Sequence, residues 1–184
     1  KEEQQHLTWD DYLEMGVIKA VEVTRAIAAT DQINLLGFCV GGTLVTAALA
    51  VLAARGDKSV ASLTLMTALL EFTDVGDIGA YIDENMVRQR EQQLANGGLV
   101  SGKELALAFS SLRANDLIWQ YVVNNYLKGK TPEAFNLLYW NSDGTNLPGP
   151  MYAYYLRHFY WDNQLVEKNK LTMCGEKIDI GNIA

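Results

Sequence analysis

Hydrophobic and polar positions follow two different periods in the N-terminal part of the chain. Apolar side chains recur at close to helical spacing after Thr8, which has the features of an N-cap with acidic residues in the first turn. Two short aliphatic runs, Ile33–Phe38 and Val60–Met66, have the character of buried parallel strands. Between them, Val40–Ala54 is apolar on nearly every side, which predicts a helix covered on both faces. Strand, helix and strand in this order predict a βαβ unit with parallel pairing.

The pattern becomes almost purely helical after about residue 70. We expect helices over 78–94, from the capping-box sequence that starts at Ser101 to about residue 112, and over 116–127. A fourth helix, rich in aromatic residues, is expected after Pro150. Aromatic side chains at this density pack a core, line an apolar cavity or face a partner subunit. The last stretch, 170–178, is typical of a small hairpin.

Composition excludes several function classes. The chain has 184 residues, of which 49% are hydrophobic, so it can bury a core of one domain. Its net charge is −7 and it has no basic run, which argues against nucleic-acid binding and against a basic membrane-binding helix. No apolar stretch is long enough for a transmembrane segment, so we expect a cytosolic protein. The two cysteines lack metal-ligand spacing, so we expect reduced thiols and no metal site.

The turn between the first strand and the following helix carries the candidate chemistry. It reads Gly37-Phe38-Cys39-Val40-Gly41-Gly42. This is the G-x-nucleophile-x-G elbow of the α/β-hydrolase fold, with cysteine in place of serine. Gly37 and Gly41 are expected because side chains there would clash where the strand reverses into the helix. A glycine-containing turn with a buried structural cysteine is the alternative interpretation.

The elbow defines the expected fold class and its division. We predict an α/β protein, a partial α/β-hydrolase fold with a mainly helical cap insertion. Residues 1–70 would form the core fragment, residues 71–165 the cap, and residues 166–184 a return toward the core. Such a cap would cover the elbow, because the active sites of this fold open at the carboxyl ends of the strands.

The position of Cys39 favours nucleophilic chemistry. At a helix N-terminus, the helix dipole and free N–H groups favour a reactive thiolate. The backbone N–H of Val40 would be one oxyanion donor. If the substrate is a thioester, attack by a thiol gives a second thioester, so the acyl group stays activated toward a hydroxyl acceptor. A cysteine elbow therefore favours transfer of an acyl group over plain hydrolysis.

The sequence does not supply a complete catalytic triad. In this fold the order is nucleophile, acid, histidine. His6 precedes the nucleophile, and His158 lies in the aromatic helix, where a packed or solvent-facing ring is the simpler interpretation. Neither histidine is a strong candidate for the general base.

The elbow and several longer motifs resemble class I polyhydroxyalkanoate synthases, the acyltransferases that make polyester storage granules. Similar stretches lie at 34–43, 50–56, 112–119, 121–127, 138–150 and 155–157, so the likeness covers essentially the whole chain. The residues of the helical region that match family motifs are Arg113, Asn115, Asp116, Trp119, Trp140, Asn141, Asp143 and Asn146. A rigid polar loop that holds the cap explains these residues as well as substrate contact does.

The resemblance implies a cytoplasmic enzyme at granules that polymerises (R)-3-hydroxyacyl-CoA, chiefly 3-hydroxybutyryl-CoA, and releases coenzyme A. Cys39 would carry the acyl unit as a thioester until the hydroxyl of the growing polyester attacks it. The resemblance further implies a homodimer through the cap, no cofactor beyond the coenzyme A thioester substrate, and a catalytic Asp and His beyond this chain. The chain alone is therefore expected to be inactive.

Two other function classes stay open. One is a cysteine hydrolase or thioesterase on the same fold, although small hydrolases of that kind lack a long aromatic cap. The other is a non-catalytic protein of the granule surface that keeps the fold for assembly.

Overall fold

The computed structural model describes residues 2–132 and 143–183. After a short turn of 3₁₀ helix, η1 (Glu2–Gln4), one long helix runs through α1 (Trp9–Asp11), the π-helical stretch η2 (Tyr12–Ile18) and α2 (Lys19–Ala28). Thr8 caps this helix. Its hydroxyl accepts the N–H of Asp11 at 3.2 Å, and the Asp11 carboxylate accepts the N–H of Thr8 at 2.8 Å. The predicted N-cap is confirmed.

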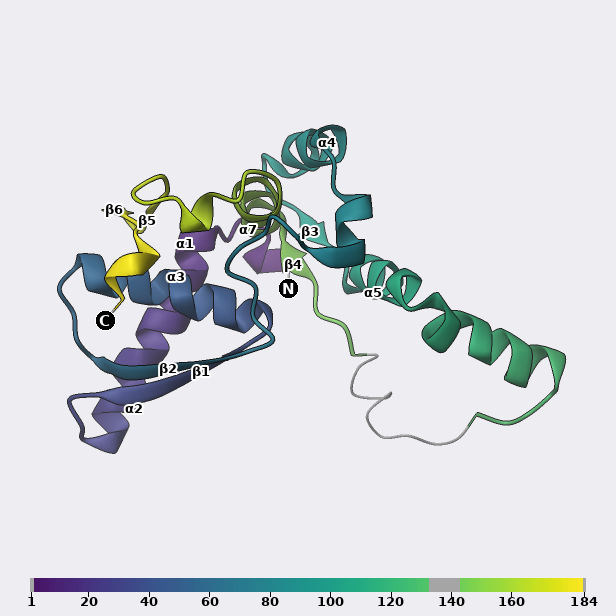
Figure 1. Ribbon diagram of the computed structural model, residues 1–184, viewed down its shortest axis with the longest axis horizontal. Coiled ribbons are helices and arrows are strands. Elements are labelled where there is room, and N and C mark those ends of the chain that lie inside the picture. Colours follow the sequence, from purple (N-terminus) through teal and green to yellow (C-terminus); the bar gives the residue numbers. More distant parts are fainter. Residues whose placement is uncertain (1, 133–142, 184) are drawn as a thin grey trace.

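The predicted βαβ unit is present and positions the elbow. Strand β1 (Ile33–Phe38) pairs in parallel with β2 (Val60–Met66), and α3 (Val40–Ala54) connects them across one face of the pair (Figure 1). Helix α3 is buried at nearly every position from Gly42 to Leu52, as its apolar sequence predicts. It ends at Arg55 and at Gly56, whose φ of 72° is the left-handed conformation expected after a helix C-terminus.

The other face of this sheet is open in the described chain. Leu35 and Leu63 point toward α3 and the core, but the alternate positions Leu36 and Phe38 are 60% and 62% exposed. The prediction of buried strands is therefore right for one face and wrong for the other. Aliphatic composition indicates a strand with two apolar faces, and only one of them is covered by the described residues.

The helical region has more breaks than its periodicity predicts. Its elements are η3 (Gly76–Tyr81), α4 (Glu84–Leu94), α5 (Gly102–Leu112), η4 (Asn115–Trp119), η5 (Val122–Leu127), α7 (Gly149–Tyr155) and η6 (Leu156–Trp161). The single helix predicted over 78–94 is divided because Asp83 caps α4 by accepting the N–H of Met86 at 2.8 Å. Ser101 caps α5 as predicted, but the capping box is wrong because Glu104 pairs with Arg90 instead.

Three short pairings complete the described chain. The two-residue strands β3 (Leu99–Val100) and β4 (Leu147–Pro148) pair antiparallel, in a region where the sequence shows almost no strand pattern. Strands β5 (Thr172–Met173) and β6 (Glu176–Lys177) form the predicted hairpin, which turns at Cys174 and Gly175 with positive φ. The short 3₁₀ turns η7 (Gln164–Val166) and η8 (Ile180–Asn182) flank this hairpin.

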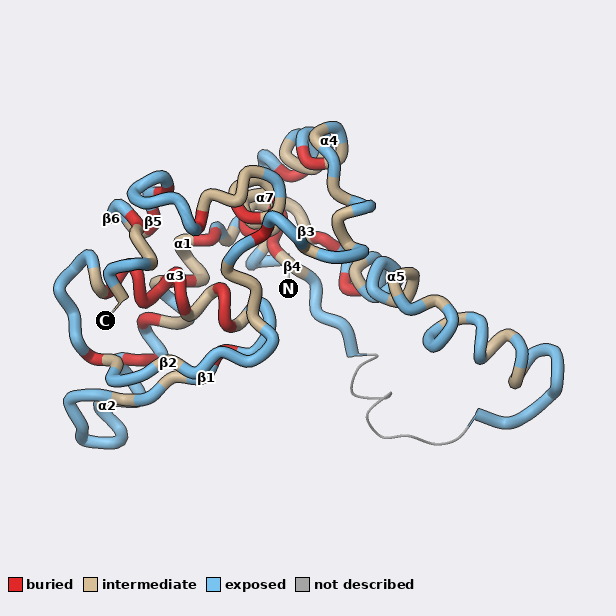
Figure 2. The backbone as a smooth tube through the Cα atoms, in the orientation of Figure 1, coloured by how far each residue is buried: buried red, intermediate tan, exposed pale blue. Residues whose placement is uncertain are grey.

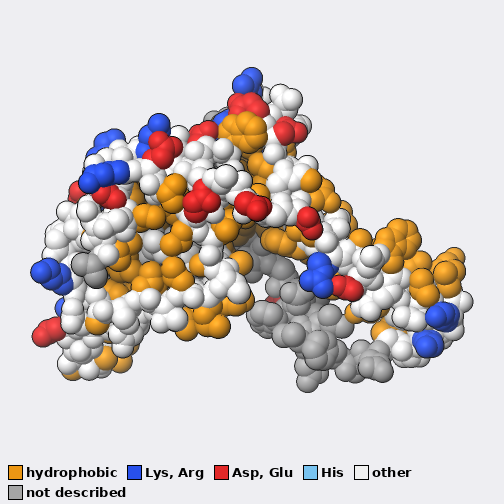
Figure 3. Space-filling view, viewed as in Figure 1, with side chains coloured by type: hydrophobic (Ala, Val, Ile, Leu, Met, Phe, Trp, Pro, Cys, Tyr) orange, Lys and Arg blue, Asp and Glu red, His pale blue; other side chains and the backbone are white. Residues whose placement is uncertain are grey.

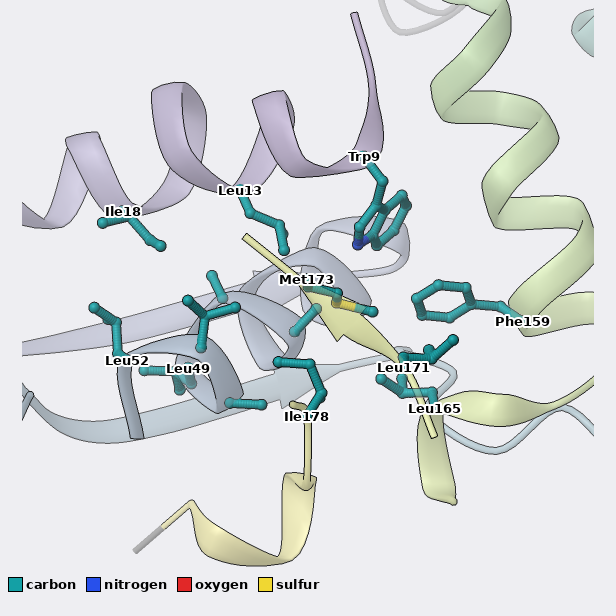
Figure 4. Close-up of a cluster of buried hydrophobic side chains, with 14 of the residues drawn as sticks. Trp9, Leu13, Ile18, Leu49, Leu52, Phe159, Leu165, Leu171, Met173 and Ile178 are labelled. Carbon is teal, nitrogen blue, oxygen red and sulfur yellow. The ribbon is translucent and has the colours of Figure 1, made fainter. Parts of the chain in front are cut away.

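One core joins segments that are far apart in sequence. Trp9 and Leu13 of the N-terminal helix face Leu49 of α3, Phe159 of η6 and Met173 of the hairpin (Figure 4). The core therefore draws on all three predicted ranges, and the division at 70 and 165 stays a prediction. By contrast, α5, η4 and η5 extend away from this core and are largely exposed (Figures 1 and 2).

In residues 2–132 and 143–183, no helix has both the length and the apolar character that a membrane crossing needs.

Candidate active site at Cys39

Cys39 lies between β1 and α3 in a strained backbone conformation. Its φ is 52° and its ψ is −130°, a region that residues with a Cβ rarely adopt and that costs about 1–3 kcal/mol. Two hydrogen bonds hold it there: its N–H donates to the carbonyl of Met66 at 3.0 Å, and its carbonyl accepts the N–H of Gly42 at 2.9 Å. The thiol is exposed. The alternative of a buried structural cysteine is therefore wrong, and the geometry is that of a nucleophile elbow.

The glycines of the elbow have unequal roles. A Cβ on Gly37 would lie 2.4 Å from the Cα of Gly42, so the expected clash at Gly37 is confirmed. The steric reason given for Gly41 is wrong, because a Cβ built there would meet no atom within 4 Å beyond its chain neighbours and the local backbone of its own helix. Gly42 is the second tight position, since its Cβ would lie 2.4 Å from the Cβ of Ala68. The helix start contacts both β1 and the segment after β2.

The N-terminus of α3 gives the site its electrostatic character. Val40 is the first residue of the helix, so the helix itself offers no acceptor for its N–H. Fifteen residues of aligned peptide dipoles place partial positive charge at the same end. An oxyanion that forms next to Cys39 would meet both features. The role of Val40 as an oxyanion donor stays a prediction.

Two tyrosines of the aromatic helix, Tyr155 and Tyr160, pack against each other, and sequence reasoning did not identify this pair. Their rings meet edge to face with centroids 5.2 Å apart. Burial raises the pKa of both phenols, and negative charge on Cys39 raises it further. The aromatic density pointed to a cavity lining as one alternative, but no local signal links these tyrosines to a cysteine so distant in sequence.

The contacts of the two histidines lie elsewhere. His158 stacks on Tyr154 with ring centroids 4.3 Å apart, and its Nδ1 lies 2.8 Å from Oε1 of Gln164. His6 is exposed, with its ring against Gly97. Among the hydrogen bonds of residues 2–132 and 143–183, none joins a histidine to Cys39. The interpretation of His158 as a packed ring is confirmed.

The second cysteine is held in a different environment. The N–H of Cys174 donates to Oδ2 of Asp10 at 2.9 Å, and its Sγ lies 3.7 Å from the carbonyl oxygen of Asp10. Burial raises the pKa of Cys174 to about 12. This thiol therefore stays protonated near neutral pH.

Three motif residues of the cap, Arg113, Asp116 and Asn146, have polar contacts within the chain. The Asn146 side-chain oxygen accepts the N–H of Gly102 at 2.9 Å, which ties the start of α5 to the segment before β4. Arg113 and Asp116 form an exposed ion pair at 2.6 Å. Trp140 and Asn141 lie outside the described residues. The described part of the chain contains no group of three or more His, Cys, Asp or Glu side chains that could hold a metal ion.

Comparison with known proteins agrees with this geometry. Residues 2–177 match the family described as alpha/beta hydrolase fold. The chain is 55% identical over 181 residues to a poly(3-hydroxyalkanoate) polymerase subunit PhaC of Cupriavidus necator, covering 96% of this chain and 31% of that protein. It is 39% identical to the corresponding subunit of Rhizobium meliloti, covering 95% of this chain and 28% of that protein.

A third relative, a poly(3-hydroxyalkanoate) polymerase of Methylorubrum extorquens, is 37% identical, with 95% of this chain and 29% of that protein covered. The chain thus spans less than a third of the length of these three relatives. The chain belongs to the alpha/beta hydrolase fold family, in which it is similar along nearly its whole length to poly(3-hydroxyalkanoate) polymerases.

Proposed function

We propose that the protein containing this chain is an acyltransferase that polymerises (R)-3-hydroxyacyl-CoA, chiefly 3-hydroxybutyryl-CoA, into polyhydroxyalkanoate. The observation that carries the proposal is the exposed thiol of Cys39 on a strained elbow, in a chain 55% identical to a poly(3-hydroxyalkanoate) polymerase subunit. An exposed nucleophile held in a costly backbone conformation is typical of a catalytic position.

The chemistry at Cys39 has two balanced steps. In the first, a base takes the proton of the Cys39 thiol, the thiolate attacks the thioester carbonyl and a new C–S bond forms. The C–S bond to coenzyme A breaks, and coenzyme A leaves as its thiol when the base returns the proton. The N–H of Val40 would stabilise the oxyanion of the tetrahedral intermediate. In the second step, a hydroxyl oxygen passes its proton to the base and attacks the acyl-cysteine carbonyl, so that a C–O bond forms. The C–S bond to Cys39 breaks, and the base returns the proton to give the Cys39 thiol.

The base for the second step is not supplied by the described contacts of Cys39. His158 is engaged with Tyr154 and Gln164, and His6 lies against Gly97. We therefore propose that a catalytic Asp and His come from outside these 184 residues. The purified 184-residue chain should then release no coenzyme A from 3-hydroxybutyryl-CoA, and turnover by that chain would contradict this part of the proposal.

The proposed function also implies a cellular location and an oligomeric state. We propose a cytoplasmic enzyme at the granule surface that forms a homodimer through the cap. Apolar side chains that gather on the surface of the extended helices support this (Figure 3). Among them, Trp119 and Tyr126 are 57% and 84% exposed. Light scattering of the full-length protein tests the dimer: Trp119→Lys should shift the mass toward the monomer, and Tyr81→Lys, outside these helices, should not.

The test of the proposed function uses the full-length protein and 3-hydroxybutyryl-CoA. Released coenzyme A is quantified by chromatography, and the acyl product is analysed as polymer or free acid. Cys39→Ala should abolish both coenzyme A release and polymer, whereas Cys174→Ala should retain them. Polymer formation by Cys39→Ala would refute the role of this thiol. Free 3-hydroxy acid as the sole product of the wild type would instead support the thioesterase alternative.

A further inference from the structure

Thr67, the first residue after β2, adopts a left-handed backbone conformation beside the elbow. Its φ is 48°. Residues with a β-branched side chain rarely adopt this conformation, so it marks strain that the surrounding structure has to hold in place. Cys39 has a φ of 52°, which is also in the left-handed range. The two strained residues therefore directly follow two paired parallel strands, β1 and β2.

One carbonyl oxygen connects these two residues. The oxygen of Met66 accepts the N–H of Cys39 at 3.0 Å and the hydroxyl of Thr67 at 2.8 Å. A carbonyl oxygen has two lone pairs, so both hydrogen bonds can form at once. The hydroxyl of Thr67 therefore lies next to the backbone of the nucleophile, and the two donors share one acceptor.

The segment that follows Thr67 is also attached to α3. The carbonyl of Leu69 accepts the hydroxyl of Thr43, which is fully buried, at 2.7 Å. A Cβ built on Gly42 would lie 2.4 Å from the Cβ of Ala68, so this alanine lies directly against the helix backbone. Thr67 thus turns the chain between one attachment at the elbow and two attachments on the first turn of α3. Such attachments on both sides keep a left-handed residue in its conformation.

The φ of Thr67 decides where the Met66 carbonyl points. A rotation about this dihedral turns the whole peptide plane between the two residues, because the peptide bond is planar. A negative φ at Thr67 would point the carbonyl in another direction, and the N–H of Cys39 would lose its acceptor. The hydroxyl of Thr67 opposes that rotation, because it donates to the same carbonyl oxygen.

We propose that Thr67 is a positioning residue, whose hydroxyl holds the Met66 carbonyl in the orientation that fixes the backbone of Cys39 for acyl transfer. The inference rests on the proposed function and adds how the nucleophile is kept in place. Placement matters because the rate of the chemical step falls steeply when a reacting atom leaves its aligned position. The hydrogen bonds are internal to the protein, so their loss should lower kcat and leave KM nearly unchanged.

The test measures single-turnover release of coenzyme A by the full-length protein over a range of 3-hydroxybutyryl-CoA concentrations. Thr67→Val removes the hydroxyl and should lower the limiting rate about tenfold, with the half-saturating concentration changed less than about twofold. Thr67→Ser keeps the hydroxyl, and its limiting rate should stay within about twofold of the wild type. Thr64→Val is the matched control, because this exposed threonine lies on β2 itself, and it should change neither value.

Thr67→Gly separates the hydroxyl from the backbone strain. Glycine adopts a φ of 48° at no steric cost but has no hydroxyl. It should therefore be more stable than Thr67→Val in urea unfolding, yet release coenzyme A about as slowly. Release at the wild-type rate by Thr67→Gly would overturn the inference, because strain alone would then explain the loss in Thr67→Val. A Thr67→Ser variant as slow as Thr67→Val would also overturn it.

Alkylation of Cys39 distinguishes positioning from a change in the thiol itself. Iodoacetamide reaches an exposed thiol from many directions, so its labelling rate depends on thiolate content and exposure and not on alignment with a bound acyl group. In Thr67→Val, labelling of Cys39 should therefore stay within about twofold of the wild type. A loss of labelling as large as the loss of coenzyme A release would refute a positioning role.

The proposed function can fail separately. If the wild type releases no coenzyme A, or if release survives Cys39→Ala, the proposed function is wrong and the inference about Thr67 falls with it. Release that depends on Cys39 but is as fast in Thr67→Val as in the wild type refutes only the inference.

Discussion

Gly37 and Gly42 face each other across the turn that presents Cys39. A Cβ on Gly37 would lie 2.4 Å from the Cα of Gly42, a distance that real Cβ atoms essentially never show. The end of β1 and the first turn of α3 are therefore in direct backbone contact. This contact fixes the angle at which the helix leaves the strand, and so fixes where the thiol points.

The first prediction concerns the two adjacent glycines. Gly42→Ala should destabilise the full-length protein by about 2 kcal/mol or more, because the new methyl would meet Ala68 at 2.4 Å. Gly41→Ala meets no atom within 4 Å beyond its chain neighbours and the local backbone of its own helix, and should be neutral, or stabilising by up to about 1 kcal/mol, since alanine is the better helix former. Urea unfolding of both variants measures the difference. Equal losses of unfolding free energy in the two variants would show that the close contact with Ala68 does not exclude a side chain at position 42.

The strain at Cys39 leads to a second prediction. Cys39→Gly and Cys39→Ala both remove the thiol, but only glycine adopts a φ of 52° with a ψ of −130° without strain. Cys39→Gly should therefore be more stable than Cys39→Ala by about 1–3 kcal/mol, although both are inactive. Differential scanning calorimetry of the two variants checks this. If Cys39→Ala is as stable as Cys39→Gly, the backbone at residue 39 is not strained in the folded protein.

These elements also show what the sequence can reveal about this fold. The βαβ unit, the elbow and the hairpin at Gly175 were predictable because each has a local signature: aliphatic strands, flanking glycines, a two-residue turn. Strands β3 and β4 were not, because two-residue strands from distant segments leave no periodic pattern. The contact of Tyr155 and Tyr160 with Phe72 was missed for the same reason, since only tertiary packing brings these distant residues together.

The two thiols should differ in reactivity, which is the third prediction. Burial raises the pKa of Cys174 to about 12, so near pH 7.5 it is almost entirely protonated and alkylates slowly. Cys39 is exposed at a helix N-terminus. Iodoacetamide should therefore label Cys39 first, as followed by peptide mass mapping, with Cys174→Ala as the control for assignment. Equal labelling rates would contradict an activated nucleophile and support a non-catalytic protein.

The fourth prediction concerns Asn163, which follows η6 and binds the segment 71–73. Its side-chain oxygen accepts the N–H of Phe72 at 2.9 Å, and its amide donates to Glu71 and to Thr73. Its own φ is 49°. Asn163→Ala should cost about 2 kcal/mol, since it frees a part-buried N–H and strains the backbone.

Asn163→Gly separates these two effects. Glycine keeps the left-handed backbone at no steric cost and removes only the side chain, so it should be more stable than alanine by about 1 kcal/mol in urea unfolding. Equal stability of the two variants would show that the left-handed backbone at residue 163 is not strained with alanine there.

The fifth prediction concerns pH and the ion-pair network of Arg157. This guanidinium, with 18% of its side chain exposed, binds Glu91 at 2.8 and 2.7 Å and Glu84 at 3.0 Å, and so joins η6 to α4. The hydrogen bonds from Arg157 hold the pKa of both carboxyls below 4.5. Because the folded pKa is the lower one, the stabilisation is present above about pH 4.5 and is lost as the pH falls through the folded values.

Arg157→Met should therefore lower the melting temperature by several degrees at pH 7. The difference in melting temperature between this variant and the wild type should become smaller between pH 5 and pH 3. Arg88→Gln is the control, because Arg88 also pairs with Glu84 at 3.0 Å but is largely exposed, and exposed pairs contribute little. Its effect should be small at every pH. A constant gap for Arg157→Met across this range would mean that Arg157 stabilises the protein through apolar packing of its stem, and that neither carboxylate contributes to holding α4 in place.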